Sequence, residues 1–190
     1  TNGVFCDDHN NGNGGIFAGF LDLNGTNQTF SVRDGSNDGD LLITSVVQNG
    51  GLIFDAVESG AGLELAGTNT YTGGTDVSGG KLILSGSLGD SSMTISGGTV
   101  EGPGALIFNV SGPTSDQIVM TGGTLDASAL SVNVNSVGAT KPEYVIVDAT
   151  GGGTISGTFV DDLPNGWFID YTATTVTLTA PPSGTSVIVR

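Results

Sequence analysis

Basic residues, cysteine, histidine and long apolar runs are all scarce in this chain. Only Arg33, Lys81, Lys141 and Arg190 oppose 19 acidic residues, which leaves a formal net charge of −15 over 190 residues. A chain this acidic repels nucleic-acid phosphates and anionic membrane surfaces. No apolar stretch approaches the roughly 18 residues that a membrane-spanning helix needs. We therefore expect neither nucleic-acid binding nor a membrane span.

The single cysteine and the single histidine restrict the available chemistry. Cys6 has no partner for an intrachain disulfide, so it is either a small buried residue or forms an intermolecular disulfide. Its position in a terminal segment slightly favours the intermolecular disulfide. His9 has no second histidine or cysteine nearby, which leaves zinc binding unsupported and predicts an exposed loop residue. The polar start at Thr1 indicates a secreted chain whose signal peptide has already been removed.

Patterns typical of helices are nearly missing. Instead, short alternating runs bounded by Gly, Asn, Asp or Pro predict β-strands. These runs lie at 28–32, 41–44, 51–54, 81–84, 92–95, 105–108, 117–120, 130–134, 144–147, 167–171 and 175–179. The chain is therefore predicted to be all-β.

Glycine, by contrast, is abundant, with 33 residues, and it gathers in X-Gly-Gly triplets. The triplets lie at 49–51, 72–74, 78–80, 96–98 and 121–123. Glycine adopts positive φ without steric cost, which suits sharp corners. Corners of similar chemistry at short spacing favour a β-solenoid, whose strands stack about 4.8 Å apart, over a sandwich with Asn-Gly or Asp-Gly hairpins. Three strands per rung give roughly six rungs.

One segment resembles a known repeat. Residues 65–84 read LAGTNTYTGGTDVSGGKLIL and are followed by SGSLG at 85–89. They resemble the autotransporter-associated β-strand repeat, with its GTNTYTGGT core, a glycine before an aliphatic strand, and a GSLG turn. The flanking resemblance extends over roughly 15–180. It implies a secreted right-handed parallel β-helix, usually on a bacterial surface.

The predicted organisation has three parts. An N-terminal arm covers 1–15, and a β-helix domain covers 16–180, with its repeat core at 62–102 and a longer-stranded part at 113–180. A linker and C-terminal strand occupy 181–190. In that strand Val187, Ile188 and Val189 are consecutive β-branched residues, which suits a strand buried on both faces. We expect this strand to be donated to a neighbouring subunit, or Val4 and Phe5 to play that part.

An acidic loop raises the question of calcium. Asp34, Asp38 and Asp40 place carboxylates at the first, fifth and seventh positions of a Gly-containing loop. The start resembles a calcium-binding loop, but the twelfth position is Ser45 and not the bidentate glutamate that such loops require. The sequence thus predicts either weak calcium binding or a plain turn. No other cofactor is expected.

The pair Asp161-Asp162 is the other candidate for chemistry. Glycoside hydrolysis needs two carboxylates at a set separation, and some β-helix enzymes supply them as aspartates. The segment from Asp161 to Gly166 is better explained as a solvated turn, because Pro164 and Asn165-Gly166 are turn residues. We therefore expect no catalytic residues.

Together these features predict a non-catalytic extracellular structural protein on a bacterial surface. Its expected partner is itself, with subunits joined head to tail into a filament through terminal strands. The alternatives are a monomeric adhesin or passenger domain that binds glycans or cells, and a carbohydrate-active β-helix enzyme.

Overall fold

The structure, a computed structural model, describes residues 3–6, 15–35 and 39–182, with side chains from residue 15 onward. Over these residues it contains 22 β-strands and no helix, which confirms the all-β prediction. Accordingly, the described residues include no helix long and apolar enough to cross a membrane. Every predicted strand run coincides or overlaps with an observed strand.

The strands form three sheets, here called A, B and C. Sheet A has the spatial order β1 (Gly3–Cys6), β3 (Phe20–Val32), β5 (Val46–Ala56), β8 (Thr75–Val77), β11 (Met93–Ile95), β15 (Ile118–Met120), β18 (Glu143–Asp148), β22 (Thr175–Thr179), β21 (Phe168–Tyr171). Sheet B has the order β2 (Gly15–Phe17), β4 (Leu41–Ile43), β6 (Gly62–Leu65), β9 (Lys81–Leu84), β12 (Thr99–Glu101), β16 (Thr124–Asp126), β19 (Thr154–Ser156). Sheet C has the order β7 (Thr68–Asn69), β10 (Ser87–Leu88), β13 (Ala105–Ser111), β17 (Ser131–Val137), β20 (Val160–Asp161), and β14 (Thr114–Ser115) pairs with β13.

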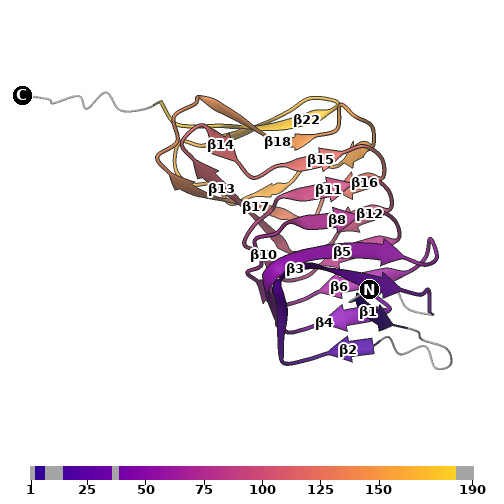
Figure 1. The fold of residues 1–190 in the computed structure, drawn as a ribbon. Coiled ribbons are helices and arrows are strands. Elements are labelled where there is room, and N and C mark those ends of the chain that lie inside the picture. The colour runs from indigo at the N-terminus through magenta and orange to yellow at the C-terminus, as the bar shows by residue number, and fades with distance from the viewer. Residues whose placement is uncertain (1–2, 7–14, 36–38, 183–190) are drawn as a thin grey trace, which may run out of the picture.

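The chain visits the sheets in a fixed order. From β9 to β20 it passes through sheet B, then C, then A, and each new strand except the short β14, which pairs antiparallel with β13, pairs in parallel with the strand of the preceding passage. We call one such passage a circuit. Two parallel neighbouring strands must be joined by a long crossover connection, and here the strands of the other two sheets form that connection. Figure 1 shows the circuits stacked from β2 at one end to β22 at the other.

The core consists of columns of apolar side chains that run through the stack. In sheet B the strand register aligns Leu41, Leu63, Leu82, Val100 and Leu125, and all five are buried. Side chains alternate between the two faces of a strand, so every second residue enters such a column. This is why short alternating runs marked the strands in the sequence. Each buried aliphatic side chain contributes about 1.5–3 kcal/mol.

A second column, in sheet A, is built from aromatic and aliphatic residues. Phe30 and Phe54 lie opposite each other in neighbouring strands, and the same register continues through Val77, Ile95 and Met120. All five side chains are buried. The core therefore extends without a break from the early to the late circuits.

Glycines form the corner between sheets A and B. Gly80, Gly98 and Gly123 have φ angles of 66°, 71° and 69°, the left-handed region that L-residues with side chains rarely adopt. They also lie directly above one another, because a Cβ on Gly123 would come within 2.7 Å of the Gly98 carbonyl oxygen. These residues belong to the triplets at 78–80, 96–98 and 121–123, so the predicted corners are confirmed there.

The triplet at 49–51 behaves differently. Asn49 (φ 57°) and Gly50 (φ 146°) lie inside the continuous strand β5, and they bend it where the register with β3 shifts. The expected corner is thus a bend within one strand. Because β5 continues through the bend, its strand is unbroken at a position where later circuits have a loop between two strands.

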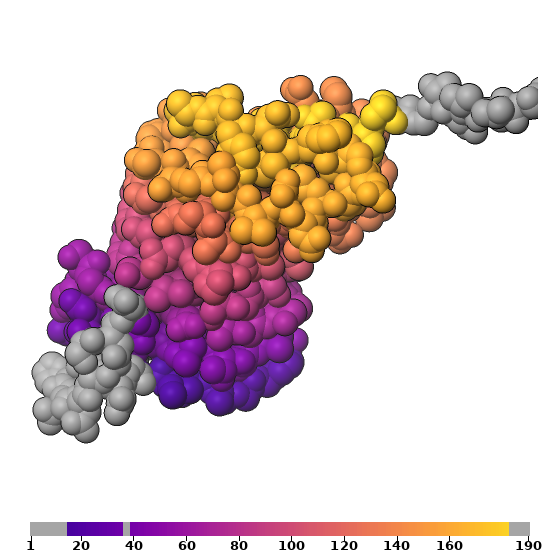
Figure 2. All heavy atoms as spheres, turned by 180° about the vertical axis from the view of Figure 1, so that it is seen from behind, coloured from indigo at the N-terminus to yellow at the C-terminus, as the bar shows by residue number. Residues whose placement is uncertain are grey.

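The last strands depart from the parallel pattern. β22 pairs antiparallel with β18, and β21 pairs antiparallel with β22. The Trp167 ring lies 6.2 Å from the Tyr144 ring of β18, centre to centre, at a tilt of 37°. Seen from behind in Figure 2, these C-terminal segments lie at the opposite end of the molecule from the N-terminal ones.

Candidate assembly surfaces

The repeat-like segment offers packing groups and no reactive ones. Gly67 has no room for a side chain, since a Cβ would overlap the Ser45 carbonyl group. The buried Asn69 accepts from the Val47 N–H (3.1 Å). Its amide also donates to the Gly67 carbonyl (3.0 Å) and to the Ser87 carbonyl (3.2 Å). One side chain thus ties together three successive circuits.

Tyr71 has a similar role in the same segment. Its hydroxyl lies 2.7 Å from Thr75 Oγ1, and both residues are buried. Burial raises the pKa of the Tyr71 hydroxyl well above its ordinary value, and the hydrogen bond to Thr75 partly opposes that rise. The tyrosine is therefore a neutral structural group, unsuited to act as an acid or base.

At the N-terminal end, β2 is the last strand of sheet B among the described residues. Phe17 occupies the same inward column as Ile43, but Phe17 is 37% exposed whereas Ile43 is fully buried. Ile16, which points outward, is 70% exposed, and the nearby Phe20 is 65% exposed. Among the described residues, exposed apolar side chains and a strand edge without a further partner therefore occur together at this end.

The C-terminal end has comparable features. β19 and β20 end sheets B and C among the described residues. Val160 in β20 is 54% exposed and Phe168 in β21 is 65% exposed. Exposed strand edges favour pairing with another strand. Both ends of the stack thus present edges and apolar surface.

The predicted donated strands are placed as follows. Val4 and Phe5 lie in β1, where their backbone is opposite Phe30 and Ser31 of the same chain. Cys6 ends β1 opposite Val32, and the fate of its thiol stays a prediction. Val187, Ile188, Val189 and His9 lie outside the described residues.

The acidic loop is anchored by backbone donors. Asp40 is 1% exposed, and its carboxylate accepts from the Gly35 N–H and the Gly62 N–H, both at 2.8 Å. Asp40 therefore joins two circuits, a structural use that sequence spacing could not reveal. Asp38 lies outside the described residues.

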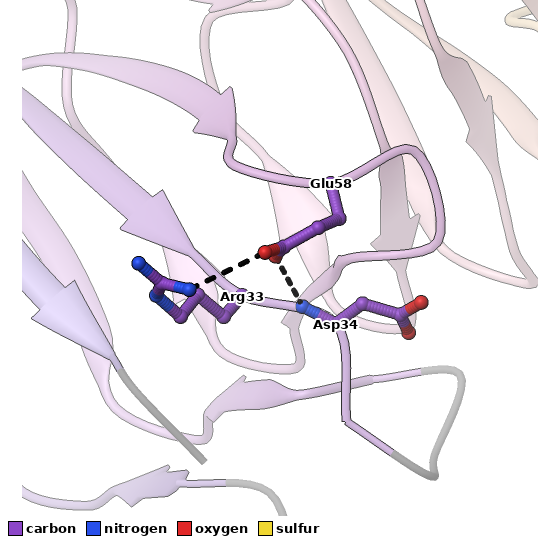
Figure 3. Close-up of polar contacts among 3 residues, drawn as sticks. All are labelled: Arg33, Asp34 and Glu58. Atoms are coloured by element: carbon purple, nitrogen blue, oxygen red, sulfur yellow. Dashed lines mark hydrogen bonds and ion pairs between the residues drawn. The ribbon is translucent and has the colours of Figure 1, made fainter. Parts of the chain in front are cut away.

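Figure 3 shows how the start of this loop is held. Glu58 accepts from Arg33 Nη1 at 3.4 Å and from the Asp34 N–H at 3.1 Å, while the Asp34 carboxylate points away from Glu58. Within the described residues no group of three or more His, Cys, Asp or Glu side chains converges as a metal site. Calcium binding at Asp34, Asp38 and Asp40 stays a prediction.

The pair Asp161-Asp162 lies at the C-terminal end. Asp161 belongs to β20 and lines an open cavity of about 630 Å³, together with Trp167, Phe168 and Asp170. Asp170 accepts from Thr179 Oγ1 at 3.0 Å. The cavity lining, all of it from described residues, includes no lysine or arginine. The arrangement offers acceptors and an exposed aromatic ring, and no basic group.

Asp116 is a half-buried carboxylate that sequence reasoning missed. It accepts from the Asn109 N–H (2.9 Å), from Asn109 Nδ2 (2.7 Å) and from the Ser91 N–H (3.3 Å). Burial nevertheless raises the pKa of this carboxyl, and the nearby Asp90 adds to the rise. The group closes the loop between sheets C and A.

Comparison of the chain with protein-family models, with curated proteins and with solved structures finds no match. The relation of residues 65–89 to the autotransporter-associated repeat therefore stays a prediction.

Proposed function

We propose that the chain is a right-handed parallel β-helix of six or seven rungs. The support is the fixed order of the three sheets and the seven strands of sheet B, which succeed one another in chain order. A crossover between parallel strands of one sheet is almost always right-handed. The resemblance at 65–89 is consistent with this fold.

In this proposal the protein is a non-catalytic subunit of an extracellular filament. The observation that carries it concerns the described residues: at both ends of one stack, strand edges without a further strand partner occur together with exposed large hydrophobic residues. Such ends need to be covered, or they pair with another molecule. A contact between unlike ends does not close on itself, so it generates a filament.

The joint is a donated strand, formed by Val187, Ile188 and Val189, with Val4 and Phe5 as the other candidate. Backbone pairing supplies the affinity of such a joint, and alternate side chains supply the fit. Burying three aliphatic side chains contributes about 5 kcal/mol before the cost of ordering the segment. The resemblance supports secretion to a bacterial surface, with other copies of the chain as partner and no cofactor required.

A monomeric adhesin is the second candidate, and the C-terminal cavity favours it. An exposed aromatic ring beside carboxylates and hydroxyls, as at Phe168, Asp161 and Thr179, suits stacking against a sugar ring and hydrogen bonding to its hydroxyls. Binding of neutral glycans to a protein that sediments as a monomer would favour this candidate.

The test of the filament is deletion of residues 181–190. Sedimentation of the full chain over a range of concentrations should show polymers, and the shortened chain should remain monomeric. Equal assembly of both chains contradicts the donated strand. Unchanged circular dichroism in the shortened chain is the control for folding.

A further inference from the structure

We infer that the edge of β2 that pairs with no other described strand, here called its free edge, is the acceptor, and that it receives residues Ser186–Arg190 of a second copy. The inference rests on the proposed filament and assigns its joint. The question it answers is which of the exposed edges the donated strand occupies. Three independent features of the described residues and of the sequence lead to β2.

The first feature is the backbone of β2. Gly15 N–H donates to Asp40 O at 2.7 Å, and Phe17 O accepts from the Thr44 N–H at 3.0 Å. Both bonds run toward β4. In a parallel ladder alternate residues bond to opposite neighbours, so the N–H and C=O of Ile16 face the free edge. This edge therefore offers one donor and one acceptor to an incoming strand.

The second feature is the match of side chains on both faces. β2 exposes Phe17 on its inward face and Ile16 on its outward face. The opposite edge strand of sheet B, β19, reads Thr154-Ile155-Ser156 and offers only one large apolar side chain. The segment Val187-Ile188-Val189 is apolar on both faces, since successive residues of a strand alternate. Whichever face turns inward, a β-branched side chain meets Phe17 and another meets Ile16.

The third feature is reach, which decides that the donor is another copy. Ala180 N–H donates to Pro142 O, so the chain leaves the stack beside β18. Five strand spacings separate β18 from β3 in sheet A, roughly 24 Å at about 4.8 Å each. From Ala180 the six residue steps to Ser186 span about 21 Å at most, which is less than this distance. The chain therefore cannot place Ser186–Arg190 on its own β2, which lies in the same circuit as β3 (Figure 1).

Charge supports the same assignment. Arg190 is the one charged residue of segment 183–190, whereas the whole chain carries a net charge of −15. The segment brings no acidic side chain to its neighbour, so the joint itself adds no side-chain charge repulsion between two acidic subunits.

The test uses a labelled synthetic peptide of residues 183–190 and the full chain diluted until it is monomeric. Fluorescence anisotropy should show saturable binding. The I16P substitution removes the N–H that faces the free edge and leaves the hydrogen bonds to β4 in place. We expect it to weaken peptide binding about tenfold, which corresponds to the loss of one hydrogen bond. I16A keeps the N–H and serves as the matched control, with a smaller loss.

Two modified peptides make the test independent of the folding of any variant. One peptide is N-methylated at Val187 and the other at Ile188. Because alternate amides of a strand face the same side, methylation should abolish binding in one of the two peptides and spare the other. Equal binding of both, or equal binding to I16P and I16A, overturns the assignment of β2.

Failure of this assignment and failure of the filament are separable. If full-length chains form tail-dependent polymers that I16P leaves unchanged, another edge accepts the strand and the filament proposal survives. If the full chain forms no polymer and the peptide does not bind, both proposals are overturned.

Discussion

Replacement of Gly98 by alanine tests the stacked corner that supports the whole fold. Gly98 has a φ of 71°, and a Cβ there would lie 2.6 Å from the Gly79 carbonyl carbon of the preceding circuit. The left-handed backbone alone costs a residue with a side chain about 1–2 kcal/mol. Displacing the packed neighbour adds about 1–3 kcal/mol. G98A should therefore destabilise the protein by about 2–5 kcal/mol.

Gly138 provides a matched control. Its φ of 66° is nearly the same, but no atom lies within 4 Å of the position of a Cβ. G138A should cost only the backbone contribution of about 1–2 kcal/mol. The difference between the two variants isolates the contact between successive corners.

The measurement is urea unfolding of both variants, followed by far-ultraviolet circular dichroism. The slope of free energy against urea should be unchanged, so that the shift in midpoint reports stability. Equal losses in the two variants, or a larger loss in G138A, would refute the stacked-corner explanation.

Three further predictions follow from the side chains. Y71F should lower the free energy of unfolding by about 1–3 kcal/mol in urea titrations, because it leaves the buried Thr75 Oγ1 unpaired; Y71F/T75V should recover part of the loss. In carbon-detected NMR the Asp116 carboxyl should titrate above its ordinary pKa, and Asp148, held ionised by Thr150, below it. Because the pKa of Asp116 is raised in the folded state, its protonation stabilises the fold fully below its ordinary pKa of 3.8, and this stabilisation is lost as pH rises through the folded-state pKa. In D116N the free energy of unfolding should therefore vary less with pH over that range. Finally, added salt should strengthen assembly, since subunits of net charge −15 repel less when screened; weaker sedimentation of polymers in salt would contradict this.

The strands and most corners were predictable from local patterns. The runs at 81–84 and 175–179 coincide with β9 and β22, because two-residue alternation directly reflects the buried columns. Very short strands such as β7 and β10 contain only two residues and leave no alternation to detect. The bend at Asn49 was predicted as a corner because composition does not distinguish a bend from a break.

The candidate site was harder to predict, since it depends on contacts between circuits. The spacing of Asp34, Asp38 and Asp40 resembled a calcium loop, yet the partners of Asp40 are the N–H groups of Gly35 and Gly62. Gly62 lies one circuit further along the chain, and no local pattern reports such a partner. Likewise, the exposure of Phe17 becomes evident only when its column with Ile43 is known.

The most direct test of the filament is negative-stain electron microscopy of the purified full chain beside the chain that lacks residues 181–190. The full chain should form unbranched filaments with a repeat along the axis equal to one subunit, and the shortened chain should give single particles. Single particles from the full chain at every concentration and salt level would contradict head-to-tail assembly.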